Sequence, residues 1–182
     1  MKIFISGGCK NGKSYYAQRL AANQQAHPLY YVATMAPVDS EDDERIKRHR
    51  LERSGWGFIT VEQPASIEKI LDKCDPQGSF LLDSLTALLA NEMFGADGGV
   101  DERAAERVAN GISLLLADVG NIVIVSDYIY SDALLYDHDT EIYRKSLALV
   151  DRTAAKSSDV VLEIAYSGVM THKGLDRIRE FL

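Results

Sequence analysis

The chain opens with a phosphate-loop motif in the setting that this motif requires. The apolar run 2–6 predicts a β-strand, and residues 7–14 directly after it read G-x-x-x-x-G-K-S. Glycines permit a tight turn around an anion, and the helix that follows presents unpaired N–H groups to a phosphate. In such a loop Lys13 reaches the β- and γ-phosphates and the Ser14 hydroxyl ligates Mg²⁺. An ordinary glycine-rich turn would explain neither the strand nor the helix, so we expect a nucleoside triphosphate to bind at Gly7, Gly8, Cys9, Lys10, Asn11, Gly12, Lys13 and Ser14.

Length, charge and cysteine usage argue against several classes of protein. The 182 residues suit one domain, 1–182, and the net charge of −7 disfavours broad binding to nucleic acid. No apolar stretch approaches the roughly 20 residues that span a bilayer, and the first strand begins too early to leave room for a signal peptide. Cys9 and Cys74 belong to no metal-like cluster. We therefore expect no membrane span and a reducing, cytoplasmic location.

Strand and helix patterns alternate beyond the motif. Apolar runs predict strands at 29–33, 58–61, 79–83, 122–126, 160–164 and 169–173. Helices fit at 14–24, at 65–73, 85–94, 101–119 and 140–157, from Ser40 to about Gly55, and over a short stretch within 174–182. Such alternation indicates a mostly parallel sheet with helices on both faces. The sequence therefore predicts a three-layer α/β fold of the P-loop NTPase (RecA-like) type.

Asp83 ends a buried strand and is the second chemical landmark. An acid at the end of an apolar strand is typical of the residue near Mg²⁺ in phosphate-loop enzymes, where ligands bind at the carboxyl edge of the sheet. Asp83 and Ser84 could instead cap the helix that starts at Leu85. Together with the loop, the pattern favours Ser14 and Asp83 as the metal-binding pair.

His49 lies among cations in a predicted helix. Helical spacing puts it on one face with Asp42, Arg45, Ile46 and Arg53. Spacing alone favours an ordinary solvated histidine at that position. The remaining histidines show no ligand-like spacing and are also expected at the surface: His27, His138 and His172.

Several ordered segments together resemble one family, the bifunctional adenosylcobinamide kinase/adenosylcobinamide-phosphate guanylyltransferases of cobalamin biosynthesis. The matching segments are Ile5-Ser6-Gly7-Gly8 through Lys13-Ser14, Tyr31-Val32-Ala33-Thr34, Arg45-Ile46-Lys47-Arg48-His49-Arg50 through Arg53, Thr60-Val61-Glu62-Gln63-Pro64, and Leu81-Leu82-Asp83-Ser84-Leu85-Thr86 with Asn91. Only the phosphate loop is specific by itself, but the order and spacing hold across nearly the whole chain.

The resemblance implies a two-step transferase. A nucleoside triphosphate, GTP or ATP, would phosphorylate adenosylcobinamide with Mg²⁺, and GTP would then pass GMP through an enzyme histidine to the phosphorylated corrinoid. The matching histidine is His49, whose neutral imidazole is a good nucleophile at neutral pH. Arg53 and Glu62 would join the nucleotide-binding residues, and Arg45, Arg48 and Arg50 could stabilise the transferring group. The resemblance also implies a homotrimer.

One segment departs from the family. After the strand 122–126, members usually continue Asn-Glu-x-Gly, whereas this chain has Asp127-Tyr128-Ile129-Tyr130. The tyrosines could simply pack, or they could alter contact with the corrinoid or the nucleotide. The sequence thus leaves open an enzyme that keeps only the kinase or the nucleotidyltransferase step, a non-catalytic nucleotide-binding module, or an enzyme that has lost activity. No Asn-Lys-x-Asp motif follows a strand, so any preference for GTP rests on the resemblance.

Overall fold

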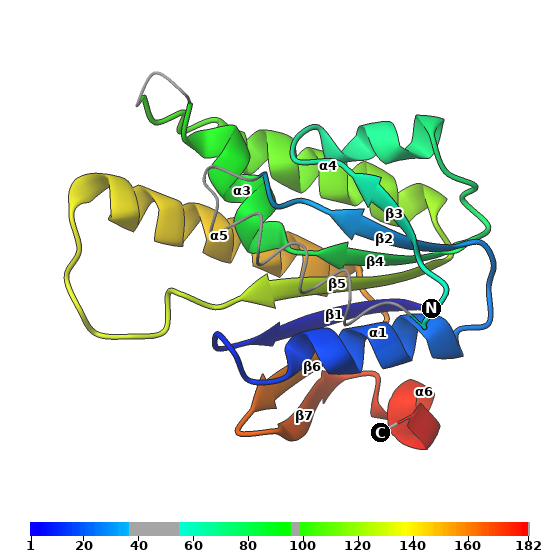
Figure 1. The fold of residues 1–182 in the computed structure, drawn as a ribbon. Helices are drawn as coiled ribbons and strands as arrows, with labels where there is room; N and C mark the ends of the chain where they lie inside the picture. The colour runs from blue at the N-terminus through cyan, green and yellow to red at the C-terminus, as the bar shows by residue number, and fades with distance from the viewer. Residues whose placement is uncertain (37–54, 96–98, 182) are drawn as a thin grey trace.

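The fold is built on one twisted sheet (Figure 1), seen in a computed structural model that describes residues 1–36, 55–95 and 99–181. Its strand order is β3-β2-β4-β5-β1-β6-β7, in which all neighbours are parallel except the last antiparallel pair. The strands are β1 Lys2–Gly7, β2 Leu29–Ala33, β3 Ile59–Glu62, β4 Ser79–Asp83, β5 Asn121–Asp127, β6 Val160–Ala165 and β7 Gly168–Lys173. The predicted helix from Ser40, with His49 and Arg53, lies outside the described residues, as does most of the Gly95–Gly99 loop.

The central strands owe their position to continuous apolar sequence. Residues 3–5, 80–82 and 122–125 are buried in β1, β4 and β5, as expected for parallel strands covered on both faces. By contrast, β3 and β7 at the two edges expose most of their residues. Apolar content therefore decides which strands lie in the centre, and it places β1, which leads into the phosphate loop, in the interior of the sheet.

Helices cover both faces of the sheet (Figure 1). On one face, α1 Lys13–Asn23 packs over β1, β4 and β5 through Ala17 and Leu20, and α6 Leu175–Ile178 packs over β6 through Ile178. The other face carries a larger core beneath α3 Leu85–Met93, α4 Ala104–Asp118 and α5 His138–Ser157. The chain ends with a 3-10 turn, η2 Arg179–Phe181. Two hydrophobic cores therefore hold three layers together, as the sequence predicted.

The helix expected at 65–73 is shorter and tighter than predicted. It is a 3-10 helix, η1 Ile67–Asp72, with Ile67 and Ile70 buried beneath it. Ser66 has a left-handed backbone with φ of 51°, so helical structure cannot begin earlier. Asp75 and Pro76 then turn the chain directly into β4. Only the six residues of η1 form helix between these two breaks, and so short a connection favours 3-10 geometry.

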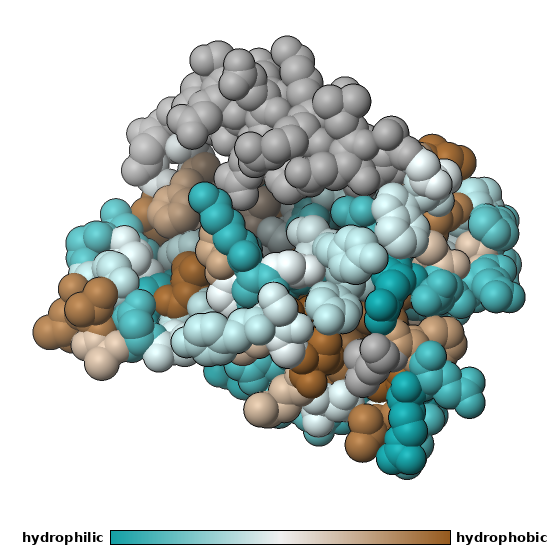
Figure 2. All heavy atoms as spheres, turned by 60° about the horizontal axis from the view of Figure 1, so that its bottom comes forward, coloured by the Kyte–Doolittle hydropathy of each residue, from teal (hydrophilic) through white to brown (hydrophobic). Residues whose placement is uncertain are grey.

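Exposed apolar side chains are dispersed over the surface. Leu135 and Tyr166 are almost fully exposed, and Tyr15 and Leu134 are largely so. On the face shown in Figure 2, hydrophobic surface lies in separate areas among hydrophilic residues. Scattered apolar residues are normal on a folded protein and identify no interface, so the homotrimer stays a prediction. Within the three described ranges, no helix combines the length and hydrophobicity needed to cross a membrane.

Candidate active site

The phosphate loop connects β1 to α1 and is shaped by glycine. Gly12 directly precedes α1 and has φ of 92°, a left-handed conformation that favours glycine. Gly7 ends β1 so close to β6 that an added Cβ would collide with the Ile164 carbonyl and the Asn11 side chain. The Asn11 amide in turn donates a hydrogen bond to the same carbonyl. Strand β6 therefore holds the loop in place before any ligand binds.

Lys13 is buried at the end of the loop and already has two oxygen partners, one of which is anionic. Its Nζ lies 2.6 Å from the Gly8 carbonyl oxygen and 2.7 Å from Oδ1 of Asp127, and the residue is only 5% exposed. Asp127 ends β5, the strand next to β1, and its N–H donates to the Thr86 hydroxyl at 2.9 Å. A nucleotide phosphate that binds Lys13 must therefore share this cation with the carboxylate of Asp127, or displace that carboxylate.

Asp83 ends β4 at the same edge of the sheet, with β5 between it and β1. One of its carboxylate oxygens accepts a hydrogen bond of 2.8 Å from the Tyr31 hydroxyl. The helix cap that the sequence left open is made by Ser84, whose hydroxyl accepts from the Ala87 N–H at 3.3 Å. Capping is thus not the work of the Asp83 side chain, and its metal-binding role beside Ser14 stays a prediction.

The remaining predicted residues are spread along the loop and the edge of the sheet. Cys9 and Lys10 are exposed on the loop, and Ser14 is half-buried in the first turn of α1. Glu62 ends β3, where it is separated from Asp83 by β2. The structure therefore brings the loop, Asp83 and Asp127 to neighbouring strand ends, with Glu62 farther along the same edge. His49 and Arg53 lie outside the described residues.

A divalent cation at this edge would find oxygen donors but no preformed cage. In residues 1–36, 55–95 and 99–181, no three His, Cys, Asp or Glu side chains are placed to hold a metal together. Mg²⁺ commonly binds through one or two protein oxygens while phosphates and waters complete its octahedron. The Ser14 hydroxyl and the Asp83 carboxylate are hard oxygen donors of the kind that this ion prefers, so the chemistry of the donor set fits.

Comparison with known proteins identifies the family. Residues 3–172 match the model of the family described as cobinamide kinase/cobinamide phosphate guanyltransferase. The chain belongs to this family. A bifunctional adenosylcobalamin biosynthesis protein of Pseudomonas aeruginosa is 36% identical over 92 residues, which are 50% of this chain and 52% of that protein. The match therefore spans about half of that relative. Its counterpart in Salmonella typhimurium is 26% identical over 181 residues, 93% of this chain and 98% of that one.

Solved structures agree with the predicted fold. A KaiC-like protein from Pyrococcus horikoshii superposes with a TM-score of 0.51 at 13% identity, covering 94% of this chain and 79% of that chain. At this identity the likeness shows the fold alone. It confirms the predicted α/β architecture, with a mostly parallel sheet between layers of helices.

Several residues in the family-like segments connect the loops at the carboxyl edge. The Thr34 hydroxyl donates to the Ser84 carbonyl and accepts from the Ser84 N–H, both at 2.8 Å. The Asn91 amide donates to the carbonyls of Thr34 and Pro64 at 2.6 and 3.0 Å. These bonds join the ends of β2, β3 and β4. We infer that these polar residues position the edge that carries Asp83.

Asp127 is the residue whose importance sequence reasoning underestimated. The sequence showed an acid after an apolar strand, but only as part of the segment that departs from the family. In the fold, Asp127 pairs with Gly7 across β5 and β1, which directs its carboxylate to Lys13. A strand-ending acid was the available signal, and it is the same signal that identified Asp83.

Proposed function

We propose that this protein phosphorylates adenosylcobinamide and then transfers GMP from GTP to the product, giving adenosylcobinamide-GDP. The observation that carries the proposal is Lys13, buried in a shaped phosphate loop one strand away from Asp127 and two from Asp83, in a chain that belongs to this family. Catalysis of phosphoryl transfer depends mainly on positioning and charge neutralisation, which a loop of this kind provides.

In the kinase step, the aminopropanol hydroxyl of the corrinoid attacks the γ-phosphorus and a nucleoside diphosphate leaves. The loop N–H groups and Lys13 would bind the phosphates, with Ser14 and Asp83 as the residues that hold Mg²⁺. When bound, this ion neutralises charge on the phosphate oxygens. Asp127 would give up Lys13 to the incoming phosphate, which leaves its carboxylate beside the loop.

In the guanylyltransferase step, an imidazole nitrogen of His49 attacks the α-phosphorus of GTP and pyrophosphate leaves. A phosphate oxygen of the corrinoid then attacks the same phosphorus, which breaks the P–N bond and regenerates the histidine. Support for His49 comes from the family-like segment around it, in which Arg45, Arg48, Arg50 and Arg53 supply positive charge. Arg53 and Glu62 would complete the nucleotide site.

Incubation with GTP labelled at the α-phosphate tests this step directly. We expect a protein adduct that is labile in acid and stable in base, because a phosphoramidate hydrolyses when its nitrogen is protonated. His49→Asn should remove the label and keep kinase turnover, whereas His138→Asn, at an exposed position, should retain both. A label that survives in His49→Asn would assign the nucleophile to another residue. No label in the parent protein would count against the second step.

A single-activity transferase is the second candidate, favoured by the segment that departs from the family. Asp127 adds a carboxylate to the phosphate loop, and Tyr128 and Tyr130 follow it in place of the usual Glu and Gly. If only one step survives, the protein would consume the triphosphate with the corrinoid but form no adduct, or form the adduct without phosphorylating the corrinoid. We also propose a cytoplasmic homotrimer, which light scattering of the purified protein would test.

A further inference from the structure

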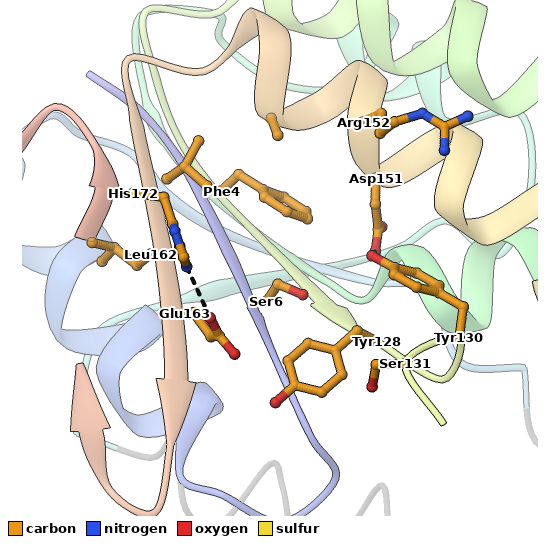
Figure 3. Close-up of a pocket in the computed structure, with 12 residues that line it drawn as sticks. Phe4, Ser6, Tyr128, Tyr130, Ser131, Asp151, Arg152, Leu162, Glu163 and His172 are labelled. Atoms are coloured by element: carbon orange, nitrogen blue, oxygen red, sulfur yellow. Dashed lines mark hydrogen bonds and ion pairs between the residues drawn. The ribbon is translucent and has the colours of Figure 1, made fainter. Parts of the chain in front are cut away.

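A cavity lies on the face of the sheet that α5 covers, beside β1, the strand that leads into the phosphate loop (Figure 3). Its volume is about 370 Å³, within the range of small-molecule sites. Strands β1 and β6 form its floor, α5 forms one side, and the segment after β5 forms another. Much of the wall is apolar and consists of Phe4, Ala155, Val161 and Leu162.

Asp151, on α5, brings an incompletely paired carboxylate to this apolar wall. The residue is only 3% exposed, and its Oδ2 accepts a hydrogen bond of 2.8 Å from the Tyr130 hydroxyl. Its Oδ1 is buried and makes no hydrogen bond of normal geometry with any residue that the structure describes. Burial raises the pKa of Asp151 to about 6, against the effect of nearby hydroxyls from Ser126 and Tyr130. A carboxylate in such a place gains most from a cationic partner.

Within the part of the chain that the structure describes, no cation forms an ion pair with Asp151. Arg152 follows Asp151 on the helix, but Figure 3 shows its guanidinium directed away from Phe4 and Ser6. Across the cavity, Glu163 adds a second carboxylate, which is paired with His172 at 2.8 Å. The Tyr128 ring lies nearby and offers an aromatic surface. Among the described lining residues, Glu163 thus has a basic partner in His172, whereas Asp151 has none within the cavity.

We propose that this cavity binds a small organic cation, in which a primary ammonium group meets Asp151 and an apolar body packs between Phe4, Val161 and Tyr128. An ammonium group is a hydrogen-bond donor that suits a buried carboxylate, and aromatic faces attract cations. The site is separate from the phosphate loop but adjoins it, because Ser6 lines the cavity and Gly7 begins the loop.

The segment after β5 contributes two aromatic residues to this site. Tyr128 and Tyr130 both line the cavity, and the Tyr130 hydroxyl donates a hydrogen bond to Asp151. Tyr130 packs against the larger hydrophobic core as well, so the packing alternative for this residue is correct but incomplete. The proposal therefore concerns this chain's own residues and does not depend on either transferase activity.

Calorimetric titration with 2-phenylethylamine, and with 2-phenylethanol as its matched neutral control, tests the proposal. The two probes share a shape and differ in one ammonium or hydroxyl group. We expect the amine to bind at least about tenfold more tightly than the alcohol, since a charge-assisted hydrogen bond contributes on the order of that factor. Asp151→Asn should weaken binding of the amine at least tenfold and leave the affinity for the alcohol unchanged. Asp118→Asn, at an exposed position, should change neither affinity.

Ala155→Phe provides an independent variant, because it fills the cavity without touching the carboxylate. It should abolish amine binding and preserve nucleotide binding at the phosphate loop, which also reports that the variant is folded. Equal affinity for amine and alcohol, equal amine affinity in the parent and Asp151→Asn, or no amine binding up to about 10 mM would overturn the proposal.

Discussion

Replacing the buried Asp151 with asparagine should stabilise the protein at neutral and alkaline pH. In the folded protein the pKa of this carboxyl is about 6, against its usual 3.8, because burial penalises the charged form. The difference between these two pKa values corresponds to about 3 kcal/mol of folding free energy, at 1.36 kcal/mol for each pKa unit. Because the residue is only 3% exposed, screening by solvent reduces this free-energy penalty only slightly. Asp151→Asn removes the buried charge and keeps an oxygen that can accept from Tyr130.

The sign follows from proton linkage. The folded state binds this proton more tightly than the unfolded state, so the contribution of Asp151 to stability is fully present below pH 4 and is lost as pH rises towards and through 6. The free energy of unfolding of Asp151→Asn should therefore equal that of the parent near pH 4. At pH 8 it should be higher than that of the parent by up to about 3 kcal/mol. For a chain of this length, that is a rise in Tm of about 6–12 °C.

Urea unfolding and thermal melting of both proteins at several pH values from 4 to 8 would measure this difference. Asp118→Asn serves as the matched control, because its carboxylate is exposed and the substitution should change stability little at any pH. A difference between Asp151→Asn and parent that does not vary with pH would refute the reasoning. So would a variant that is less stable than the parent at pH 8.

Three further variants test the phosphate loop. Lys13→Ala should weaken triphosphate binding by about 10- to 100-fold, because it removes a charge-assisted contact, and unchanged affinity by calorimetry would contradict the loop assignment. Asp127→Asn should tighten triphosphate binding about tenfold in the same assay, because Lys13 no longer has to leave a carboxylate; weaker binding would instead mean that Asp127 holds the metal. Asp83→Asn should raise the Mg²⁺ concentration needed for half-maximal activity while Tm stays nearly constant, since Ser84 caps α3; a large loss of Tm with normal Mg²⁺ dependence would favour a structural role.

The sequence predicted the strands well because their signals are local. The bounds of β2 and β4 agree with the predicted 29–33 and 79–83, since short apolar runs between turn residues leave little room for another assignment. The helix at 65–73 was less predictable, because the left-handed backbone at Ser66 is set by the surrounding packing. The Glu92 side chain accepts a hydrogen bond of 2.8 Å from the Ser66 N–H, and these two residues are 26 positions apart in the sequence.

The site was predictable only in part for the same reason. The loop residues are contiguous and carry their own motif, whereas the Lys13–Asp127 pair joins residues 114 positions apart. That pair forms because β5 lies between β1 and β4 in the sheet. The local sequence does not determine this strand order. The cavity at Asp151 depends on even more elements, because β1, β6, β7, α5 and the segment after β5 all contribute lining residues.

The end of β5 acts on two sites at once, and strand geometry explains why. Successive residues of a strand point to opposite faces of a sheet, so a change of two neighbouring residues affects both faces. Asp127 reaches Lys13 in the phosphate loop, and Tyr128 lines the cavity on the α5 side. Two consecutive residues of this chain therefore set the charge beside the phosphate loop and part of the wall of a neighbouring cavity.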